Sequence, residues 1–131
     1  MALHVICGPP GSGKTTLANK LHRDGDLIFD FDKVAEAIAA PIDNRRGDYI
    51  GVIEALRKAV IREAANYRGT IFVIITSFKA ALALERRHRA ELTVLNVPSN
   101  VCVERLIKDQ RPGLERRIDA VKKWWKNYVG R

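Results

Sequence analysis

The sequence predicts an α/β fold in which helices cover both faces of a parallel sheet of about four to five strands, a three-layer α/β/α arrangement. Short apolar runs alternate with helix-like segments along all 131 residues, the order that is typical of a parallel sheet. The first apolar run, residues 3–7, leads into a glycine-rich loop and then a helix-like segment. No repeat or linker interrupts the chain, so we expect one domain over residues 1–131.

The glycine-rich loop matches the phosphate-binding motif G-x-x-x-x-G-K-[ST], the P-loop, at every fixed position from Gly8 to Thr15. Glycines let the backbone N–H groups turn inward, and a helix beginning near Lys14 adds the positive end of its dipole. We expect Lys14 to reach the β- and γ-phosphates of ATP and Thr15 to ligate Mg²⁺. The predicted nucleotide-binding residues are Gly8, Pro9, Pro10, Gly11, Ser12, Gly13, Lys14, Thr15 and Thr16.

The other predicted elements follow from apolar periodicity and turn residues. Residues 70–76 are almost continuously apolar and β-branched, as expected of a central parallel strand that is buried on both faces. Further strands are expected at residues 27–29 and 92–97. After the first helix, which ends near Leu21, helices are expected at residues 33–40, 48–67, 79–89, 99–108 and 114–129.

Two of these helices carry apolar residues at steps of three and four, which predicts the face that each one buries. In the helix at residues 48–67, which Asp48 could cap, the buried stripe is expected to be Ile53, Leu56, Val60, Ala64 and Tyr67. In the last helix the buried residues are expected to be Leu114, Ile118, Val121 and Trp125. Trp124 falls outside this stripe, so a partner, a neighbouring subunit or single-stranded bases could cover it.

Composition favours a globular protein that stays in the cytoplasm of its host cell. Hydrophobic residues make up 47% of the chain, and no apolar run approaches the roughly 20 residues that span a membrane. We recognise no charged-then-apolar leader at the N-terminus and expect no membrane partner. Cys7 and Cys102 are far apart and in no ligand spacing, so buried, reduced thiols are expected rather than a disulfide or a metal site.

The net charge of +8 is carried by the second half of the chain. Residues 1–60 hold eight basic and eight acidic residues, whereas residues 61–131 hold fifteen basic and seven acidic residues. This asymmetry suggests an anionic partner, either nucleic acid or the phosphates of the nucleotide, and a solvated basic face is the alternative. The densest basic run, residues 86–89, could contact a polynucleotide backbone or simply complement the dipole at a helix C-terminus.

Asp30 and Asp32 directly follow the second predicted strand. Ligands of a parallel α/β sheet lie beyond the carboxyl ends of its strands, so both carboxylates are expected beside the phosphates and their metal. There, one carboxylate can orient or deprotonate an acceptor hydroxyl while its neighbour holds a metal-bound water. A pair of turn or capping aspartates is the alternative, and Asp32 is well placed to cap the helix that begins at Lys33.

The P-loop together with Phe29-Asp30-Phe31-Asp32 resembles the small P-loop kinases. These include the kinase domain of phage polynucleotide kinases, shikimate- and gluconate-type kinases, and small phage-encoded P-loop proteins. The resemblance covers the whole chain in element order, although only the P-loop is a specific motif. It implies that Asp32 contacts the acceptor hydroxyl as general base and that Asp30 helps to hold Mg²⁺ through water.

The resemblance also implies a mobile, arginine-rich lid, here around residues 105–117. A guanidinium closing over the transferring phosphoryl group would neutralise its spread negative charge. Arg105 and Arg111 are the expected catalytic arginines, ahead of Lys108, Arg116 and Arg117. A solvated basic helix end is the alternative for each of them.

The end of the third predicted strand departs from related patterns, because Thr76 and Ser77 stand where AAA-type motor ATPases carry adjacent acidic residues. Capping the following helix is the expected role of one of these hydroxyls. We therefore expect an ATP- and Mg²⁺-dependent phosphotransferase, with a polynucleotide 5′-hydroxyl or a nucleoside as acceptor. The alternative is a nucleotide-binding accessory protein on nucleic acid that lacks kinase activity. The sequence leaves open the oligomeric state and the choice between ATP and GTP.

Overall fold

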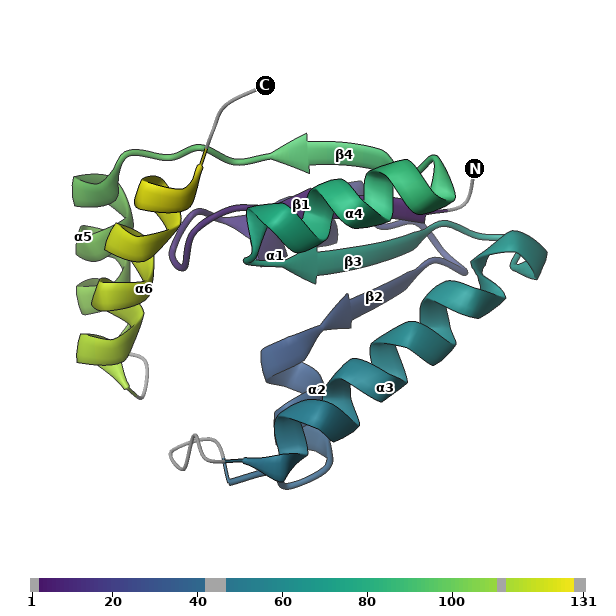
Figure 1. The fold of residues 1–131 in the computed structure, drawn as a ribbon, viewed down its shortest axis with the longest axis horizontal. Coiled ribbons are helices and arrows are strands. Elements are labelled where there is room, and N and C mark those ends of the chain that lie inside the picture. Colours follow the sequence, from purple (N-terminus) through teal and green to yellow (C-terminus); the bar gives the residue numbers. More distant parts are fainter. Residues whose placement is uncertain (1–2, 42–46, 111–112, 129–131) are drawn as a thin grey trace.

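The computed structural model describes residues 3–41, 47–110 and 113–128, in which four strands form one parallel sheet (Figure 1). The strand order is β2-β3-β1-β4, and each neighbouring pair is parallel. The strands are β1 (Leu3–Cys7), β2 (Leu27–Asp30), β3 (Ile71–Ile75) and β4 (Glu91–Val94). The helices are α1 (Lys14–Leu21), α2 (Phe31–Ala37), α3 (Asp48–Glu63), the short 3₁₀ helix η1 (Ala64–Asn66), α4 (Phe78–His88), α5 (Ser99–Asp109) and α6 (Leu114–Asn127). The predicted three-layer α/β fold is confirmed.

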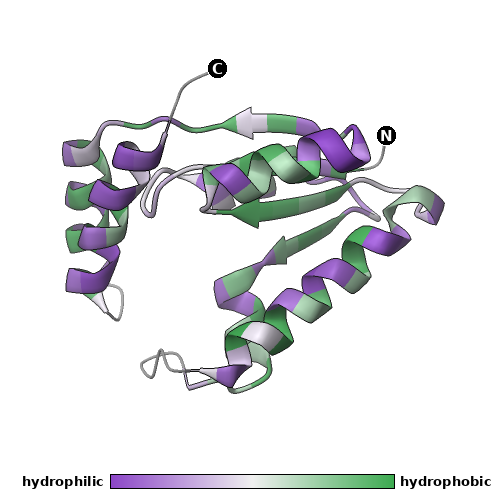
Figure 2. Ribbon diagram, in the orientation of Figure 1, coloured by the Kyte–Doolittle hydropathy of each residue, from purple (hydrophilic) through white to green (hydrophobic). Residues whose placement is uncertain are grey.

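Helices cover both faces of the sheet because the side chains of each strand alternate between them. Val5 and Val73 point into the larger core, to which α3 and α4 contribute Ile53 and Phe78. On the opposite face, a smaller core joins the sheet to α1 through Ile6, Phe72, Ile74 and Ala18. All five residues of β3 are buried, as predicted for a central strand, and β3 is coloured hydrophobic throughout in Figure 2.

The helices α5 and α6 lie side by side beyond the carboxyl ends of the strands (Figure 1). They pack through the buried side chains of Cys102, Leu106 and Val121. Cys7 and Cys102 are free and buried, as predicted, and burial raises the pKa of the Cys7 thiol to about 11. The Cys7 thiol therefore stays protonated at neutral pH and acts as a small apolar side chain.

The buried face of α6 differs from the face that the sequence predicted. Trp124, which lies outside the predicted stripe, is only 5% exposed, and its Nε1–H donates to the carbonyl of Thr76 at 2.7 Å. Its ring stacks on Tyr128 with centroids 4.8 Å apart. Trp125 is half-buried and donates its Nε1–H to Val97 at 3.1 Å. The prediction was wrong because α6 packs on two surfaces at once, the end of β3 and the helix α5.

The apolar stripe of α3 is also rotated from the predicted one. Ile53 and Ala64 are buried as expected, and Val60 is half-buried, but Leu56 is 39% exposed and Ile61 is buried in its place. The buried residues continue at steps of four and three, which keeps them on one side of the helix. Asp48 lies in the first turn of α3, with Gly47 at the N-cap position and no side-chain cap.

Replacing Trp124 should destabilise the protein more than any change on the exposed side of α6. Trp124→Ala removes a buried aromatic ring and is expected to lower the free energy of unfolding by about 3–5 kcal/mol. Trp124→Phe keeps most of the ring but leaves a carbonyl without its donor, at a cost of about 1–3 kcal/mol. Urea unfolding followed by circular dichroism measures both values, with Lys123→Ala as the matched surface control. Equal urea midpoints for Trp124→Ala and Lys123→Ala would show that the Trp124 side chain contributes nothing to the stability of the fold.

Candidate active site

The loop between β1 and α1 has the geometry that phosphate binding requires. Gly11 and Gly13 have φ values of 79° and 93°, in the left-handed region that favours glycine. A Cβ at Gly11 would also lie 2.7 Å from the carbonyl oxygen of Cys102, so α5 leaves no room there for a side chain. The loop ends at the first turn of α1, whose N-terminal N–H groups and dipole favour an anion at this point. Nucleotide binding by residues 8–16 stays a prediction.

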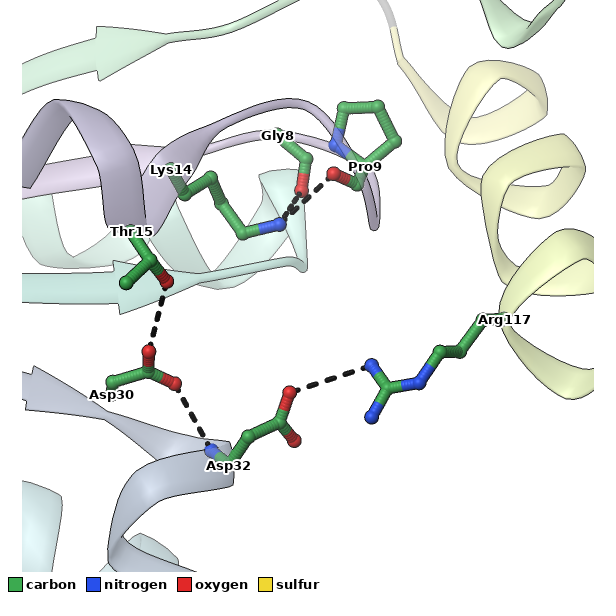
Figure 3. Close-up of polar contacts among 7 residues, drawn as sticks. All are labelled: Gly8, Pro9, Lys14, Thr15, Asp30, Asp32 and Arg117. Atoms are coloured by element: carbon green, nitrogen blue, oxygen red, sulfur yellow. Dashed lines mark hydrogen bonds and ion pairs between the residues drawn. The ribbon is translucent and has the colours of Figure 1, made fainter. Parts of the chain in front are cut away.

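Lys14 folds back onto its own loop. Its Nζ donates hydrogen bonds to the carbonyls of Gly8 at 2.8 Å and Pro9 at 2.9 Å (Figure 3). Burial lowers the pKa of the Lys14 ammonium to about 8, although the carboxylates of Asp30 and Asp32 partly oppose this shift. The charged amine is thus held at the loop by two neutral carbonyls, which phosphate oxygens can replace with stronger, charge-assisted hydrogen bonds.

This lowered pKa predicts the pH dependence of nucleotide binding. Below pH 8 Lys14 is protonated before ADP arrives, whereas above pH 8 binding must also take up a proton, because the phosphates raise the pKa of Lys14. The affinity for ADP is therefore expected to be constant from about pH 7 to 8 and to fall by up to about tenfold per pH unit above that. Titration calorimetry in two buffers measures the affinity and the proton uptake. Lys14→Arg, which stays charged, should lose the decline, and an unchanged decline in this variant would contradict the assignment to Lys14.

Thr15 and Asp30 form the second part of the site. The Thr15 hydroxyl donates to Oδ2 of Asp30 at 2.9 Å, while Oδ1 of Asp30 accepts the backbone N–H of Asp32 at 3.1 Å (Figure 3). Asp30 is therefore the N-cap of α2, whereas the sequence offered this cap to Asp32 as the alternative to a catalytic role. The difference arises because α2 begins at Phe31, two residues earlier than predicted; it also ends at Ala37 rather than at residue 40.

Because Asp30 caps α2, the Asp32 side chain is not needed for the cap and faces the first turn of α6. Its Oδ2 pairs with Nη1 of Arg117 at 3.4 Å (Figure 3). The Arg117 side chain is only 12% exposed, whereas that of Asp32 is 48% exposed and open to an incoming molecule. The Arg117 guanidinium thus contacts Asp32, which is the carboxylate of the Asp30–Asp32 pair that does not cap α2.

The expected lid arginines are placed differently from one another. Arg105 lies over the P-loop, where its Nη1 donates to the carbonyl of Gly11 at 3.3 Å. Arg111 lies outside the described residues, and the motion of a lid around residues 105–117 stays a prediction. Arg117, ranked below both from the sequence, contacts Asp32. Its spacing was the missed signal, because it lies four residues before Val121 and hence on the inner face of α6.

One cavity of about 550 Å³ at the carboxyl ends of β2 and β3 is lined by Lys14, Thr15, Asp30, Asp32 and Arg117. Ser77 and Thr76 lie on its wall, and the Ser77 hydroxyl caps α4 by accepting the N–H of Ala80 at 3.2 Å, the capping role predicted from the sequence. The sequence interpretation missed the wall supplied by α3, to which Glu54 and Arg57 contribute. Glu54 and Arg57 are three residues apart and lie on one side of α3, but that side could be assigned to the cavity only once the orientation of the helix was known.

The described residues contain no further group of histidine, cysteine or carboxylate side chains that could hold a metal ion. No helix in this part of the chain has the length and apolar character to cross a membrane.

A phosphate-binding loop, a threonine–carboxylate pair and a second, accessible carboxylate at the edge of a parallel sheet define a P-loop nucleotide-binding protein with a kinase-like fold. A family model described as "AAA domain" matches residues 3–130, and the chain belongs to this family. The sequence matches none of the curated proteins with which it was compared.

Solved structures share this fold at low sequence identity. A chain of the Pnkp1/Rnl/Hen1 RNA repair complex superposes with a TM-score of 0.67 at 19% identity, covering 96% of this chain but only 45% of its own length. Shikimate kinase from Bacteroides thetaiotaomicron gives 0.60 at 20% identity, covering 95% of this chain and 77% of the kinase. The Deinococcus radiodurans tunicamycin resistance protein gives 0.56 at 19% identity, with 97% and 84% covered. The chain thus spans less than half of the RNA repair protein.

Proposed function

We propose that this protein is an ATP-dependent phosphotransferase that moves the γ-phosphate of ATP to an acceptor hydroxyl. The observation that carries the proposal is the accessible Asp32 carboxylate, which opens into the same cavity as the P-loop and is engaged by Arg117 rather than by the cap of α2. A polynucleotide 5′-hydroxyl is the first acceptor to test, because the second half of the chain is basic. A nucleoside is the second.

In the proposed reaction, the loop amides and Lys14 hold the triphosphate, and Asp32 accepts a hydrogen bond from the acceptor hydroxyl. The hydroxyl oxygen attacks the γ-phosphorus in line, the bond from that phosphorus to the β–γ bridging oxygen breaks, and ADP leaves. Asp32 takes the proton that the acceptor oxygen loses. Arg117, beside Asp32, and Arg105, over the loop, are proposed to neutralise the negative charge that spreads over the transferring group.

The Thr15–Asp30 pair fits a magnesium site. A hydroxyl oxygen and a carboxylate, 2.9 Å apart at the mouth of the P-loop, are hard oxygen donors of the kind that Mg²⁺ prefers. In this proposal Thr15 binds the ion directly, and Asp30 holds one of its waters. The ion would supply charge neutralisation between the β- and γ-phosphates.

The rival function is that of a nucleotide-binding accessory protein that acts on nucleic acid without kinase activity. The observation that favours it is the end of β3, where Ile75 is followed by Thr76 and Ser77 and no carboxylate complements Asp30. The same feature argues against a motor ATPase, which needs acidic groups there to activate water.

The deciding experiment is transfer of labelled γ-phosphate from ATP with Mg²⁺ to single-stranded DNA, to RNA and to mixed nucleosides. Each oligonucleotide is offered with a free 5′-hydroxyl and, as the matched control, with that hydroxyl already phosphorylated. Saturable labelling of the free 5′-hydroxyl alone would support a polynucleotide kinase, and labelling of nucleosides alone would support a small-molecule kinase. ATP binding and turnover with no labelled acceptor would overturn the proposal in favour of the rival.

A further inference from the structure

A second cavity, of about 520 Å³, lies between the C-terminal halves of α3 and α4. We name it the α3–α4 groove. It begins beside the site cavity and extends toward the N-terminal end of the sheet, where Leu3 contributes to its wall. Apolar side chains line the space between the two helices: four alanines together with Leu3, Ile61 and Leu84.

The charged lining of the groove is entirely basic. Arg57, Lys58 and Arg62 extend from α3, and Arg87 extends from α4. No aspartate or glutamate is among the described residues that line it. Four cations around this apolar hollow favour an extended polyanion, because charges facing one another across a groove reinforce the field inside it. Two of these cations, Arg62 and Arg87, belong to the basic second half of the chain.

The groove is continuous with the site. Arg57 and Ala80 line both cavities, so a molecule whose end lies near Asp32 can continue along α3 without leaving the surface. Residues 57–65 of α3 and η1 give this path a length of about 12 Å. Apart from the imidazole of His88, no aromatic ring lines it among the described residues, so the groove offers mainly positive charge and little surface on which bases could stack.

From these observations we propose that the α3–α4 groove binds the sugar–phosphate backbone of a single-stranded nucleic acid whose 5′-terminal hydroxyl lies at Asp32. The proposal rests on the proposed function for the direction of the strand, but binding in the groove is measurable without any transfer. Because contacts would be to phosphates, recognition in the groove is expected to be independent of base sequence and sensitive to salt.

The test compares two double variants that each remove two positive charges. Arg62→Ala with Arg87→Ala removes one positive charge from each wall of the groove. Lys20→Ala with Arg23→Ala removes two exposed charges from α1 and the turn that follows it. Binding of a 3′-labelled single-stranded oligonucleotide is measured by fluorescence anisotropy over a range of salt concentrations. The groove variant is expected to bind about tenfold more weakly at about 0.1 M salt, with a salt slope less steep by about 1.4, or 0.7 per lost phosphate contact.

A charge-preserving variant separates phosphate contacts from structural effects. Arg62→Lys with Arg87→Lys should retain most of the binding, because a lysine serves a single phosphate as a point charge. Equal losses in the groove and control variants, or no salt-sensitive binding by the wild-type protein, would overturn the proposal. An anionic protein partner would then be the better explanation for the groove.

The two proposals fail in different ways. Groove-dependent binding of oligonucleotides without any labelled acceptor would retain the groove and reject the kinase. Labelling of oligonucleotides with the same KM in the groove variant and the control would retain the kinase and reject the groove. If both hold, the groove variant should raise the KM for an oligonucleotide and leave the KM for a nucleoside 3′-phosphate unchanged.

Discussion

Asp32→Asn is expected to reduce phosphoryl transfer by about 10²–10⁴-fold while leaving ATP binding intact. The amide keeps the shape of the side chain but cannot take the proton from an acceptor hydroxyl. ATP binding should persist because the loop, Lys14 and the Thr15–Asp30 pair do not depend on Asp32 for their contacts. Transfer is measured with the acceptor that the wild-type protein labels, and ATP affinity is measured in parallel by calorimetry.

The fold should tolerate Asp32→Asn. The ion pair that it removes joins atoms 3.4 Å apart, and the Asp32 side chain is half exposed, so its loss should change the free energy of unfolding by less than about 1 kcal/mol. Asp24→Asn, in an exposed turn after α1, is the control that removes a carboxylate outside the cavity. Full transfer activity in Asp32→Asn, with ATP affinity unchanged, would move the general base to another residue.

Lys14→Ala is expected to remove the stabilisation of the fold by ATP and to lower transfer by at least about 10²–10³-fold. The Lys14 ammonium donates to the loop carbonyls and is proposed to contact the β- and γ-phosphates in the transition state as well. Removing one such donor typically lowers the rate by about 10²–10³-fold. A ligand that binds only the folded state raises its melting temperature. A thermal scan with and without ATP and Mg²⁺ therefore reports the loss directly, with Lys20→Ala on the exposed side of α1 as control.

Without nucleotide, the same variant should be at least as stable as the wild-type protein near neutral pH. The pKa of Lys14 falls from 10.5 to about 8 on folding because burial disfavours its charge. Below pH 8 both states hold the proton, and the folded state bears the full cost of the buried charge. Between pH 8 and 10.5 the folded state holds fewer protons than the unfolded state, so wild-type stability contributed by this group rises with pH. A large loss of stability at pH 7 in Lys14→Ala would instead show that its hydrogen bonds hold the loop together.

Short-range features of this protein could be predicted from the sequence because neighbouring residues determine them. The P-loop, the central strand at residues 71–75, the cap supplied by Ser77 and the burial of both cysteines all depend on local spacing and residue type. Element order was enough to predict a parallel sheet and to bring Asp30 and Asp32 to its carboxyl edge. Each of these features follows from a few adjacent residues or from a rule about connection order.

Features that depend on how one helix faces another required the tertiary structure. Arg117 meets Asp32 across 85 positions of sequence. Its spacing to Val121 indicates the inner face of α6 but does not identify Asp32 as the group opposite that face. A shift of two residues in the start of α2 made Asp30, rather than Asp32, the cap of that helix.

The tertiary structure also decided which side of each helix is buried. A helix such as α6, packed on two surfaces, buries a wider face than periodicity alone indicates, and this placed Trp124 in the core. The orientation of α3 brought Arg57 to the site and formed the α3–α4 groove. The sequence by itself therefore determined the phosphate-binding chemistry and the sheet. The pairing of groups around the cavity was decided by packing, because contacts between distant segments depend on the rotation and tilt of whole helices.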